Sequence, residues 1–337
     1  MNNKFFPSNF LFIIIMITGT MITLSSSHWL TMWVGLEINL IGFLPLMNIK
    51  GKMLEAEASM KYFIIQSMSS SILIMTSLIL YSFNFTWYTM FSNKMLSLLM
   101  ILSLVFKLAG APLHFWLPNM TKHMTWLIIF LMLTWQKLAP LFMLNLINNN
   151  YIIMIIISML STLIGSFMIL NQTNMQLIIT YSSISHLGWM LSMIMFNSSL
   201  TFIYFMNYII ISMPLLYMMN MQANNYMYML TQKNKFNKFI IPTLVLSLAG
   251  LPPLLGFMSK LLMLILLMEM NMMILTIVML ISTLISLYFY MNMTFMSLIK
   301  TYYLFDNYLN MKSYNFIIVF NIFSLFPFYF IINNMIK

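Results

Sequence analysis

The chain has 337 residues, of which 62% are hydrophobic and only 6% are charged, and its mean hydropathy is +0.93. This composition excludes a soluble globular protein and is typical of a protein that crosses a membrane several times. The formal charge of +10 does not indicate a nucleic-acid partner, because the lysines fall in short loops between apolar stretches, and the absence of cysteine excludes disulfides and thiolate metal sites.

Apolar stretches of membrane length follow one another, and we expect about eleven transmembrane helices in a single all-α membrane domain over residues 1–337. Because Phe10 already starts a span, we expect no signal or transit peptide before it. The richness in Met, Ile, Asn, Phe and Lys favours an organelle-encoded chain. The expected spans are residues 10–24, 29–48, 56–83, 95–112, 125–147, 151–170, 175–196, a stretch that ends near 221, 239–268, 272–299 and 316–336.

The fourth and the ninth spans carry the same interruption. The pattern Leu-Ala-Gly-X-Pro occurs at residues 108–112 and recurs at 248–252, with Lys107 and Lys260 nearby. Glycine and proline break a helix and free backbone groups that lipid cannot satisfy, so each break is expected beside a water-filled cavity or other protein. The alternative at either position is a simple proline kink.

The matched interruptions indicate an internal repeat. Spans one to five, residues 10–147, and spans six to ten, residues 151–299, can be laid side by side, with one extra C-terminal helix at 316–336. Because five is an odd number, the second set would enter the membrane from the opposite side, which predicts inverted five-helix repeats with discontinuous fourth and ninth helices. Most loop lysines lie on the side of the N-terminus, which predicts that the N-terminus is inside and the C-terminus outside.

Four ionisable residues are expected within the membrane: Glu37, Lys107, Lys137 and Lys260. A charge at the centre of a membrane helix costs about 2.5–3.5 kcal/mol, so such residues usually serve a function. Desolvation favours the neutral form of an amine that has no acidic partner, which lets it take up and release a proton. A lysine that faces Glu37 would stay charged until the two are separated. The residues predict a proton relay; the alternative is that Lys107 or Lys260 extends its amine to a membrane surface.

Two histidines are further candidates for the relay. His186 ends a run rich in hydroxyl groups that starts at Thr180, and an imidazole can pass protons near neutral pH. Hydrogen bonding between helices is an equally weighted alternative for His186. His114, followed by Phe115 and Trp116, favours an aromatic belt just past the fourth span, although it could also line a cavity. The histidines are not spaced as a metal site.

A series of short motifs runs in order from the first span to the ninth: SSHW (26–29), WVGLE (33–37), AGAPLHFWLP (109–118), TWQKLAP (134–140), LNQT (170–173), YSSI (181–184), HLGW (186–189) and GLPPL (250–254). In this order the motifs resemble those of the mitochondrial NADH:ubiquinone oxidoreductase chain 2 family. The last two spans add little to this resemblance. The chain departs from the family pattern where Met175 and Gln176 replace a basic pair, and where Ser259 and Leu261 flank Lys260 in place of proline and tryptophan.

The resemblance implies an antiporter-like core subunit in the membrane arm of respiratory complex I, in the mitochondrial inner membrane with its N-terminus in the matrix and its C-terminus in the intermembrane space. Such a subunit translocates protons, coupled to electron transfer from NADH to ubiquinone elsewhere in the complex. The resemblance also implies that Glu37 pairs with Lys107, that Lys137 is the central lysine and that Lys260 is the distal one. Implied partners are a neighbouring antiporter-like subunit, the small chain 4L type subunit, accessory subunits and phospholipids such as cardiolipin.

We expect no cofactor in this chain, and NADH, FMN, iron–sulfur clusters and ubiquinone in other subunits of the complex. The chain would then be a subunit of an enzyme without a redox site of its own. Two alternative functions are a stand-alone cation/proton antiporter and a purely structural membrane subunit. A cation site would need several oxygen ligands, and Glu37 as the sole carboxylate expected inside the membrane argues against the first.

Overall fold

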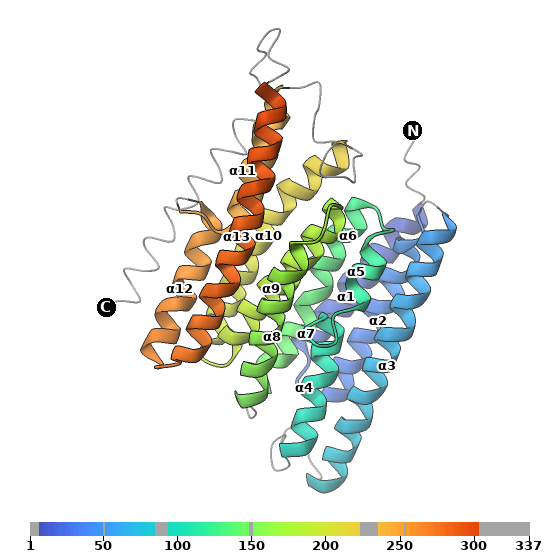
Figure 1. The fold of residues 1–337 in the computed structure, drawn as a ribbon. Helices are drawn as coiled ribbons and strands as arrows, with labels where there is room; N and C mark the ends of the chain where they lie inside the picture. Colours follow the sequence, from blue (N-terminus) through green and yellow to red (C-terminus); the bar gives the residue numbers. More distant parts are fainter. Residues whose placement is uncertain are drawn as a thin grey trace. The chain divides into compact units, whose positions relative to one another are not determined.

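A computed structural model describes residues 7–49, 51–84, 94–147, 151–222, 235–252 and 254–302, and these residues form α-helices without a β-strand (Figure 1). Seven helical spans in this part of the chain, one of them residues 126–145, are long and apolar enough to cross a membrane. The prediction of an all-α multi-pass membrane protein is therefore confirmed. The helix expected at residues 316–336 lies outside the described residues.

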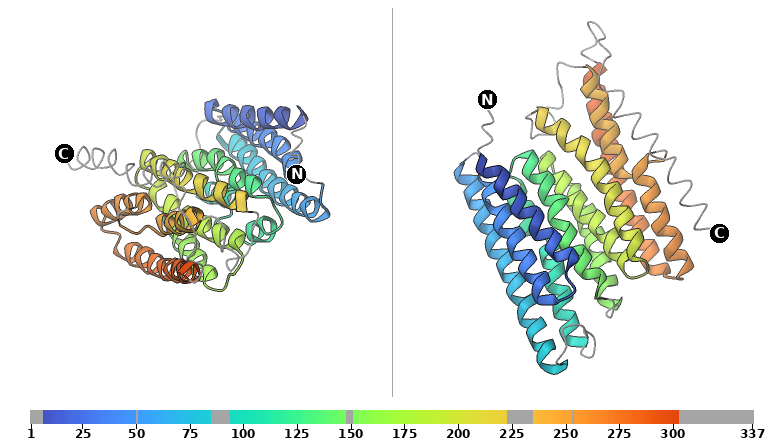
Figure 2. Two further views of the ribbon diagram at one scale, coloured as in Figure 1. Left: turned by 90° about the horizontal axis from the view of Figure 1, so that it is seen from above. Right: turned by 180° about the vertical axis from the view of Figure 1, so that it is seen from behind.

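The chain divides into two compact units, Met1–Ile157 and Ser158–Lys337. In the first unit, α1 packs against α2, α2 against α3, α3 against α4, and α4 against α7. Figure 2 shows the blue helices α1, α2 and α3 side by side. The helices of this unit are α1 (Pro7–Ser25), α2 (Trp29–Met47), α3 (Met53–Asn84), α4 (Lys94–Leu108), α5 (Trp116–Thr121), α6 (Trp126–Leu133), α7 (Trp135–Asn145) and the first residues of α8 (Tyr151–Ile169).

Glycines bring α1 and α2 into direct backbone contact. A Cβ atom added at Gly19 would lie 2.5 Å from the backbone nitrogen of Asn39, and one added at Gly35 would lie 2.8 Å from the Gly19 carbonyl oxygen. One added at Gly42 would lie 2.6 Å from the nitrogen of Met16. Lipid gives helices little hydrophobic reason to associate, so close van der Waals contact of this kind holds membrane helices together.

In the second unit, α9 is buried along most of its length. It packs against α10 and α12, and α13 packs against α11 and α12. Gly188 lets α9 approach α8, since an added Cβ atom would overlap the Ser161 and Thr162 side chains. The further helices of this unit are α9 (Met175–Ile194), α10 (Ser198–Gln222), α11 (Lys235–Ala249), α12 (Leu255–Glu269) and α13 (Met273–Tyr302).

Both predicted interruptions end a helix. Helix α4 ends at Leu108 and α11 ends at Ala249, so each helix ends before the chain reaches the proline of its motif. After α4, Ala109 adopts a left-handed conformation with φ of 61°, and the N–H of Gly110 donates to the Val105 carbonyl. After α11 the left-handed residue is Gly250, with φ of 83°. The helix therefore ends one position earlier within the five-residue pattern in the first unit than in the second.

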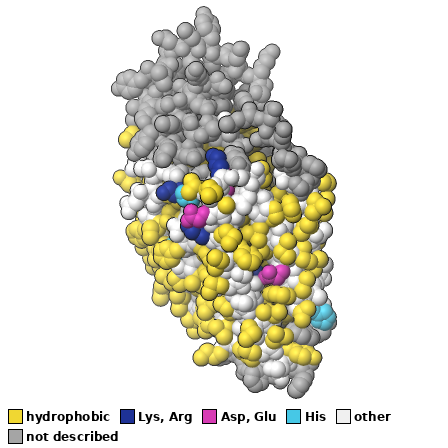
Figure 3. Space-filling model, turned by 90° about the vertical axis from the view of Figure 1, so that its right-hand side faces the viewer, with side chains coloured by type: hydrophobic (Ala, Val, Ile, Leu, Met, Phe, Trp, Pro, Cys, Tyr) yellow, Lys and Arg dark blue, Asp and Glu magenta, His cyan; other side chains and the backbone are white. Residues whose placement is uncertain are grey.

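The exterior is apolar, as a membrane environment requires. On α3 the exposed side chains include Met60, Phe63 and Ile64. Hydrophobic side chains cover most of the described surface in Figure 3, and most of the charged ones gather in one area. The exposed ion pair between Lys61 and Glu57, with 2.6 Å between Nζ and Oε1, lies one turn apart on the same helix.

Candidate functional site

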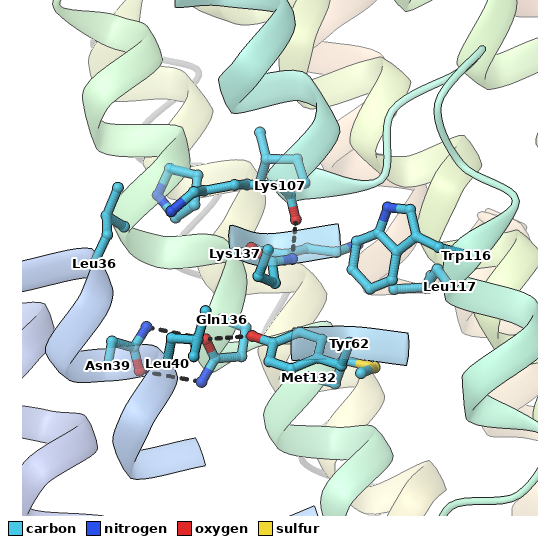
Figure 4. A pocket seen from close by; sticks show the side chains of 13 residues that line it. Leu36, Asn39, Leu40, Tyr62, Lys107, Trp116, Leu117, Met132, Gln136 and Lys137 are labelled. Atoms are coloured by element: carbon cyan, nitrogen blue, oxygen red, sulfur yellow. Dashed lines mark hydrogen bonds between the residues drawn. The ribbon is translucent and has the colours of Figure 1, made fainter. Parts of the chain in front are cut away.

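The first unit contains a cavity of about 20 Å³ between α2, α3, α4, α5, α6 and α7 (Figure 4). A cavity needs about 10–15 Å³ and several polar partners to hold a water molecule, so this one has room and partners for one. The apolar part of the wall includes Leu36, Leu40 and Met132. The polar side chains in the wall are Asn39, Tyr62, Gln66, Lys107, Gln136 and Lys137.

Lys107 lies in the last turn of α4, and its side chain is buried at 6% exposure. The Glu37 carboxylate on α2 interacts electrostatically with Lys107 and with the Tyr62 hydroxyl. Among the described residues, an ion pair forms between Lys61 and Glu57 but none forms at Glu37. The Oε1 atom of Glu37 is buried and has no hydrogen-bond donor. The acid and the amine are therefore within each other's field, but they do not form a contact ion pair.

Carbonyl groups in the last turn of α4 accept hydrogen bonds from side chains that carry no charge. The indole N–H of Trp116 donates to the Phe106 carbonyl at 3.1 Å, and the amide of Gln66 donates to the Lys107 carbonyl at 3.3 Å. The last carbonyls of a helix need such partners when they are buried. Because neutral groups supply them here, the Lys107 ammonium is not needed to close the helix and is left to the cavity.

Lys137 lies in the first turn of α7 and is 2% exposed. The span that the sequence predicts to be one helix from residue 125 is divided at Thr134 into α6 and α7. Both the N–H and the hydroxyl of Thr134 donate to the Phe130 carbonyl, at 3.0 and 2.7 Å, and the N–H of Lys137 donates to the Thr134 carbonyl at 3.1 Å. The division therefore places Lys137 at the beginning of a new helix and not in the middle of a continuous one.

Two amide side chains join α2 to α7 at the wall of the cavity. Asn39 Nδ2 donates to Gln136 Oε1 at 2.9 Å, and Gln136 Nε2 donates back to Asn39 Oδ1 at 3.1 Å (Figure 4). The Tyr62 hydroxyl on α3 donates to the same Gln136 oxygen at 3.3 Å. These three residues were not predicted from the sequence, although a polar amide within an apolar span is itself a signal that a partner exists.

Lys260 belongs to the second unit and has a different environment. It lies on α12, it is 8% exposed, and its Nζ donates to the Ala249 carbonyl, the last of α11, at 2.7 Å. Its aliphatic chain lies over Gly250, where an added Cβ atom would be 3.0 Å from Lys260 Cδ. A lysine that extends its amine to a membrane surface would be exposed at its end. All three lysines, Lys107, Lys137 and Lys260, are buried instead.

Both candidate histidines are buried within their own units. His186 Nδ1 lies 2.8 Å from the Tyr204 hydroxyl, and its ring lies 5.2 Å from that of Tyr208. This is the interhelical hydrogen bond that the sequence offered as an alternative, and a relay role for His186 stays a prediction. His114 is 1% exposed in the segment between α4 and α5, so its side chain is buried, and a relay role for His114 also stays a prediction.

The predicted site residues therefore fall into two groups. Lys107 and Lys137 line the cavity of the first unit, and the Glu37 carboxylate interacts electrostatically with Lys107, whereas Lys260 and His186 lie in the second unit. In chemical terms, the first group places two amines on one polar cavity, with a carboxylate close enough to influence one of them. Such an arrangement can hold a proton on either amine and can bias which amine holds it.

Known proteins match most of the chain. Residues 26–286 match the family described as NADH:quinone oxidoreductase/Mrp antiporter, transmembrane region. NADH-ubiquinone oxidoreductase chain 2 of Anopheles gambiae is 38% identical over 94% of this chain and 95% of its own length. The protein of the same name from Bos taurus is 39% identical over 85% of each chain. A chain of respiratory complex I from Thermus thermophilus, solved with bound aureothin, shares the fold, with a TM-score of 0.79, 22% identity and coverage of 86% of this chain and 70% of that one.

Proposed function

Because the chain belongs to the NADH-ubiquinone oxidoreductase chain 2 family, we propose that it is a core membrane subunit of the proton-pumping NADH:ubiquinone oxidoreductase, complex I. The resemblance seen in the sequence motifs is confirmed by these relatives. The chain's part in the reaction is to move protons across the membrane. Oxidation of NADH and reduction of ubiquinone supply the energy elsewhere in the complex.

The observation that carries this function is the cavity shared by Lys107 and Lys137. Both amines are buried and line a space that accommodates a water molecule, with hydroxyl and amide groups around it. A water molecule there can accept a proton from the lysine that is an ammonium and donate one of its own to the lysine that is a neutral amine. Buried amines suit this task because burial reduces their preference for the charged form.

Glu37 would control the first step. A carboxylate near an amine favours the charged form of that amine, so we expect the proton to stay on Lys107 while Glu37 is near. When the negative field is withdrawn or neutralised, Lys107 releases its proton toward the cavity and Lys137. A change at Glu37 could therefore be passed on as a proton movement without any redox group in this chain.

The remaining features of the proposal concern assembly and topology. We place Lys260 as the distal residue of the relay, with His186 and His114 as possible members. We also propose eleven spans with inverted repeats over residues 10–147 and 151–299, in the mitochondrial inner membrane with the N-terminus in the matrix. The proposed partners are a neighbouring antiporter-like subunit, the small chain 4L type subunit, accessory subunits and cardiolipin. NADH, FMN, iron–sulfur clusters and ubiquinone would bind to other subunits.

Replacement of Lys137 by methionine in the assembled complex tests the function. The side chain keeps its length and loses the amine, so we expect proton transfer through this subunit to slow by about 100-fold or more, the scale typical of a positioned acid or base. Protons pumped per NADH oxidised, measured in sealed membranes, should fall. Lys52→Met, at an exposed lysine before α3, is the matched control and should pump as the wild type does.

The result also separates the alternatives. An unchanged pumping ratio for Lys137→Met would support a purely structural subunit. Exchange of Na⁺ for H⁺ by the isolated chain in vesicles would support a stand-alone antiporter.

A further inference from the structure

We propose that Asn39 and Gln136 are positioning residues that hold Lys137 at its working place relative to Lys107. The proposal rests on the proton-translocating function given above and adds two residues to it. Neither amide transfers a proton. Their part is to fix the geometry in which the two lysines share one cavity.

Lys137 needs such an anchor because of where its helix begins. Helix α7 starts at Trp135, after the division at Thr134, and Lys137 lies in the first turn. The first turn of a helix lacks half of the backbone hydrogen bonds that would fix its direction. Gln136 directly precedes Lys137, so its two hydrogen bonds to Asn39 hold this turn against α2.

The other end of the anchor is rigid. Asn39 is 3% exposed, and its backbone nitrogen lies against Gly19 of α1, with no room for a Cβ atom between them. Helix α2 also carries Glu37, two residues before Asn39. The amide pair, by which we mean Asn39 and Gln136, therefore fixes the helix of the carboxylate and the helix of the central lysine to each other.

The chemistry of an amide suits this position. Each side chain both donates and accepts within the pair, and the Tyr62 hydroxyl donates to the second lone pair of Gln136 Oε1 (Figure 4). Leaving a buried donor or acceptor without a partner is unfavourable, so the pair has one preferred arrangement. Amides stay neutral over the physiological pH range, and the pair does not compete with the lysines for a proton. A carboxylate at the same place would attract the proton of a neighbouring ammonium.

The test uses the assembled complex in sealed membranes and measures protons pumped per NADH oxidised. Asn39→Leu and Gln136→Leu each remove one half of the pair, and we expect the ratio to fall toward that of Lys137→Met. The exchange variant, Asn39→Gln combined with Gln136→Asn, restores two facing amides with the same summed length. It should recover the wild-type ratio, which a role for either residue alone would not explain.

Asn48→Leu is the matched control. Its amide joins the residue after α2 to α3, since Asn48 Nδ2 donates to Ser59 Oγ at 3.2 Å, but neither residue lines the cavity. We expect it to pump normally. If the leucine variants do not assemble, Asn39→Asp replaces them, because it keeps the size of the side chain and introduces a charge; a lowered ratio is expected.

Several outcomes would overturn the proposal. These are a wild-type ratio in the leucine variants, a wild-type ratio in Asn39→Asp, or an exchange variant that assembles and pumps no better than the single variants. The parallel result for Lys137→Met keeps the two proposals apart. If Lys137→Met lowers pumping while the amide variants do not, only the positioning role is wrong.

Discussion

The two interrupted helices share a sequence pattern but are closed in different ways. At the end of α4, the Trp116 indole and the Gln66 amide bind the last carbonyls, and Lys107 turns to a cavity. At the end of α11, the ammonium of Lys260 itself binds the last carbonyl. The pattern therefore determines where each helix stops. The neighbouring side chains determine whether the lysine closes the break or lies beside it.

The largest expected effect comes from closing the space between α11 and α12. A Cβ atom at Gly256 would overlap the carbonyl oxygen of Ser247, which is backbone and cannot rotate away. Overpacking of this kind costs about 1–3 kcal/mol and occasionally more, and we expect Gly256→Ala to lie at the upper end. The measurement is the temperature at which the assembled complex dissociates. Met268→Ala, at an exposed position on the same helix, is the control and should change it little.

A second comparison removes one donor from each break. Trp116→Phe keeps most of the ring and leaves the Phe106 carbonyl without its indole donor, which should cost about 1–3 kcal/mol of stability. Lys260→Met also loses a bond, worth about 1.5–3 kcal/mol, but it removes a buried charge that costs about 2.5–3.5 kcal/mol. We therefore expect Lys260→Met to assemble with wild-type stability and yet pump fewer protons per NADH. Equal destabilisation by the two variants would contradict this difference between the breaks.

The smallest effect is expected at the left-handed residues, where the two breaks should respond with opposite signs. A left-handed conformation costs a residue with a Cβ atom about 1–2 kcal/mol, whereas glycine loses about 0.5–1 kcal/mol more entropy on folding. Ala109→Gly should therefore stabilise the first unit by about 0.5–1 kcal/mol. Gly250→Ala should destabilise the second, because the new methyl group also meets the Lys260 side chain. Thermal dissociation of the complex measures both, and a shift of the same sign in the two variants would contradict the assignment.

Local signals in the sequence predicted much of the fold. The ends of α4 and α11 follow from glycine and proline, whose backbone effects act within a few residues. The identity of the left-handed residue did not follow, since glycine is the natural choice and Ala109 takes that place in the first unit. The division at Thr134 was also missed, because a threonine that bonds to its own helix leaves no distinctive pattern.

Part of the candidate site could likewise be predicted from the sequence, and part could not. Ionisable residues are rare in apolar spans, so Glu37, Lys107 and Lys137 could be selected as site candidates from the sequence. The amide pair could not be assembled from the sequence, because Asn39 and Gln136 are 97 positions apart and only the fold brings them together. The partner of Lys260 could not be predicted either, because it is a main-chain carbonyl and every residue has one.

The glycine contact between α1 and α2 has a mechanical consequence. Where Gly19 and Gly35 meet, main-chain atoms touch without an intervening layer of side chains that could change rotamer and absorb a displacement. We therefore expect a displacement of α1 to move α2 with it, together with the Glu37 side chain that α2 carries.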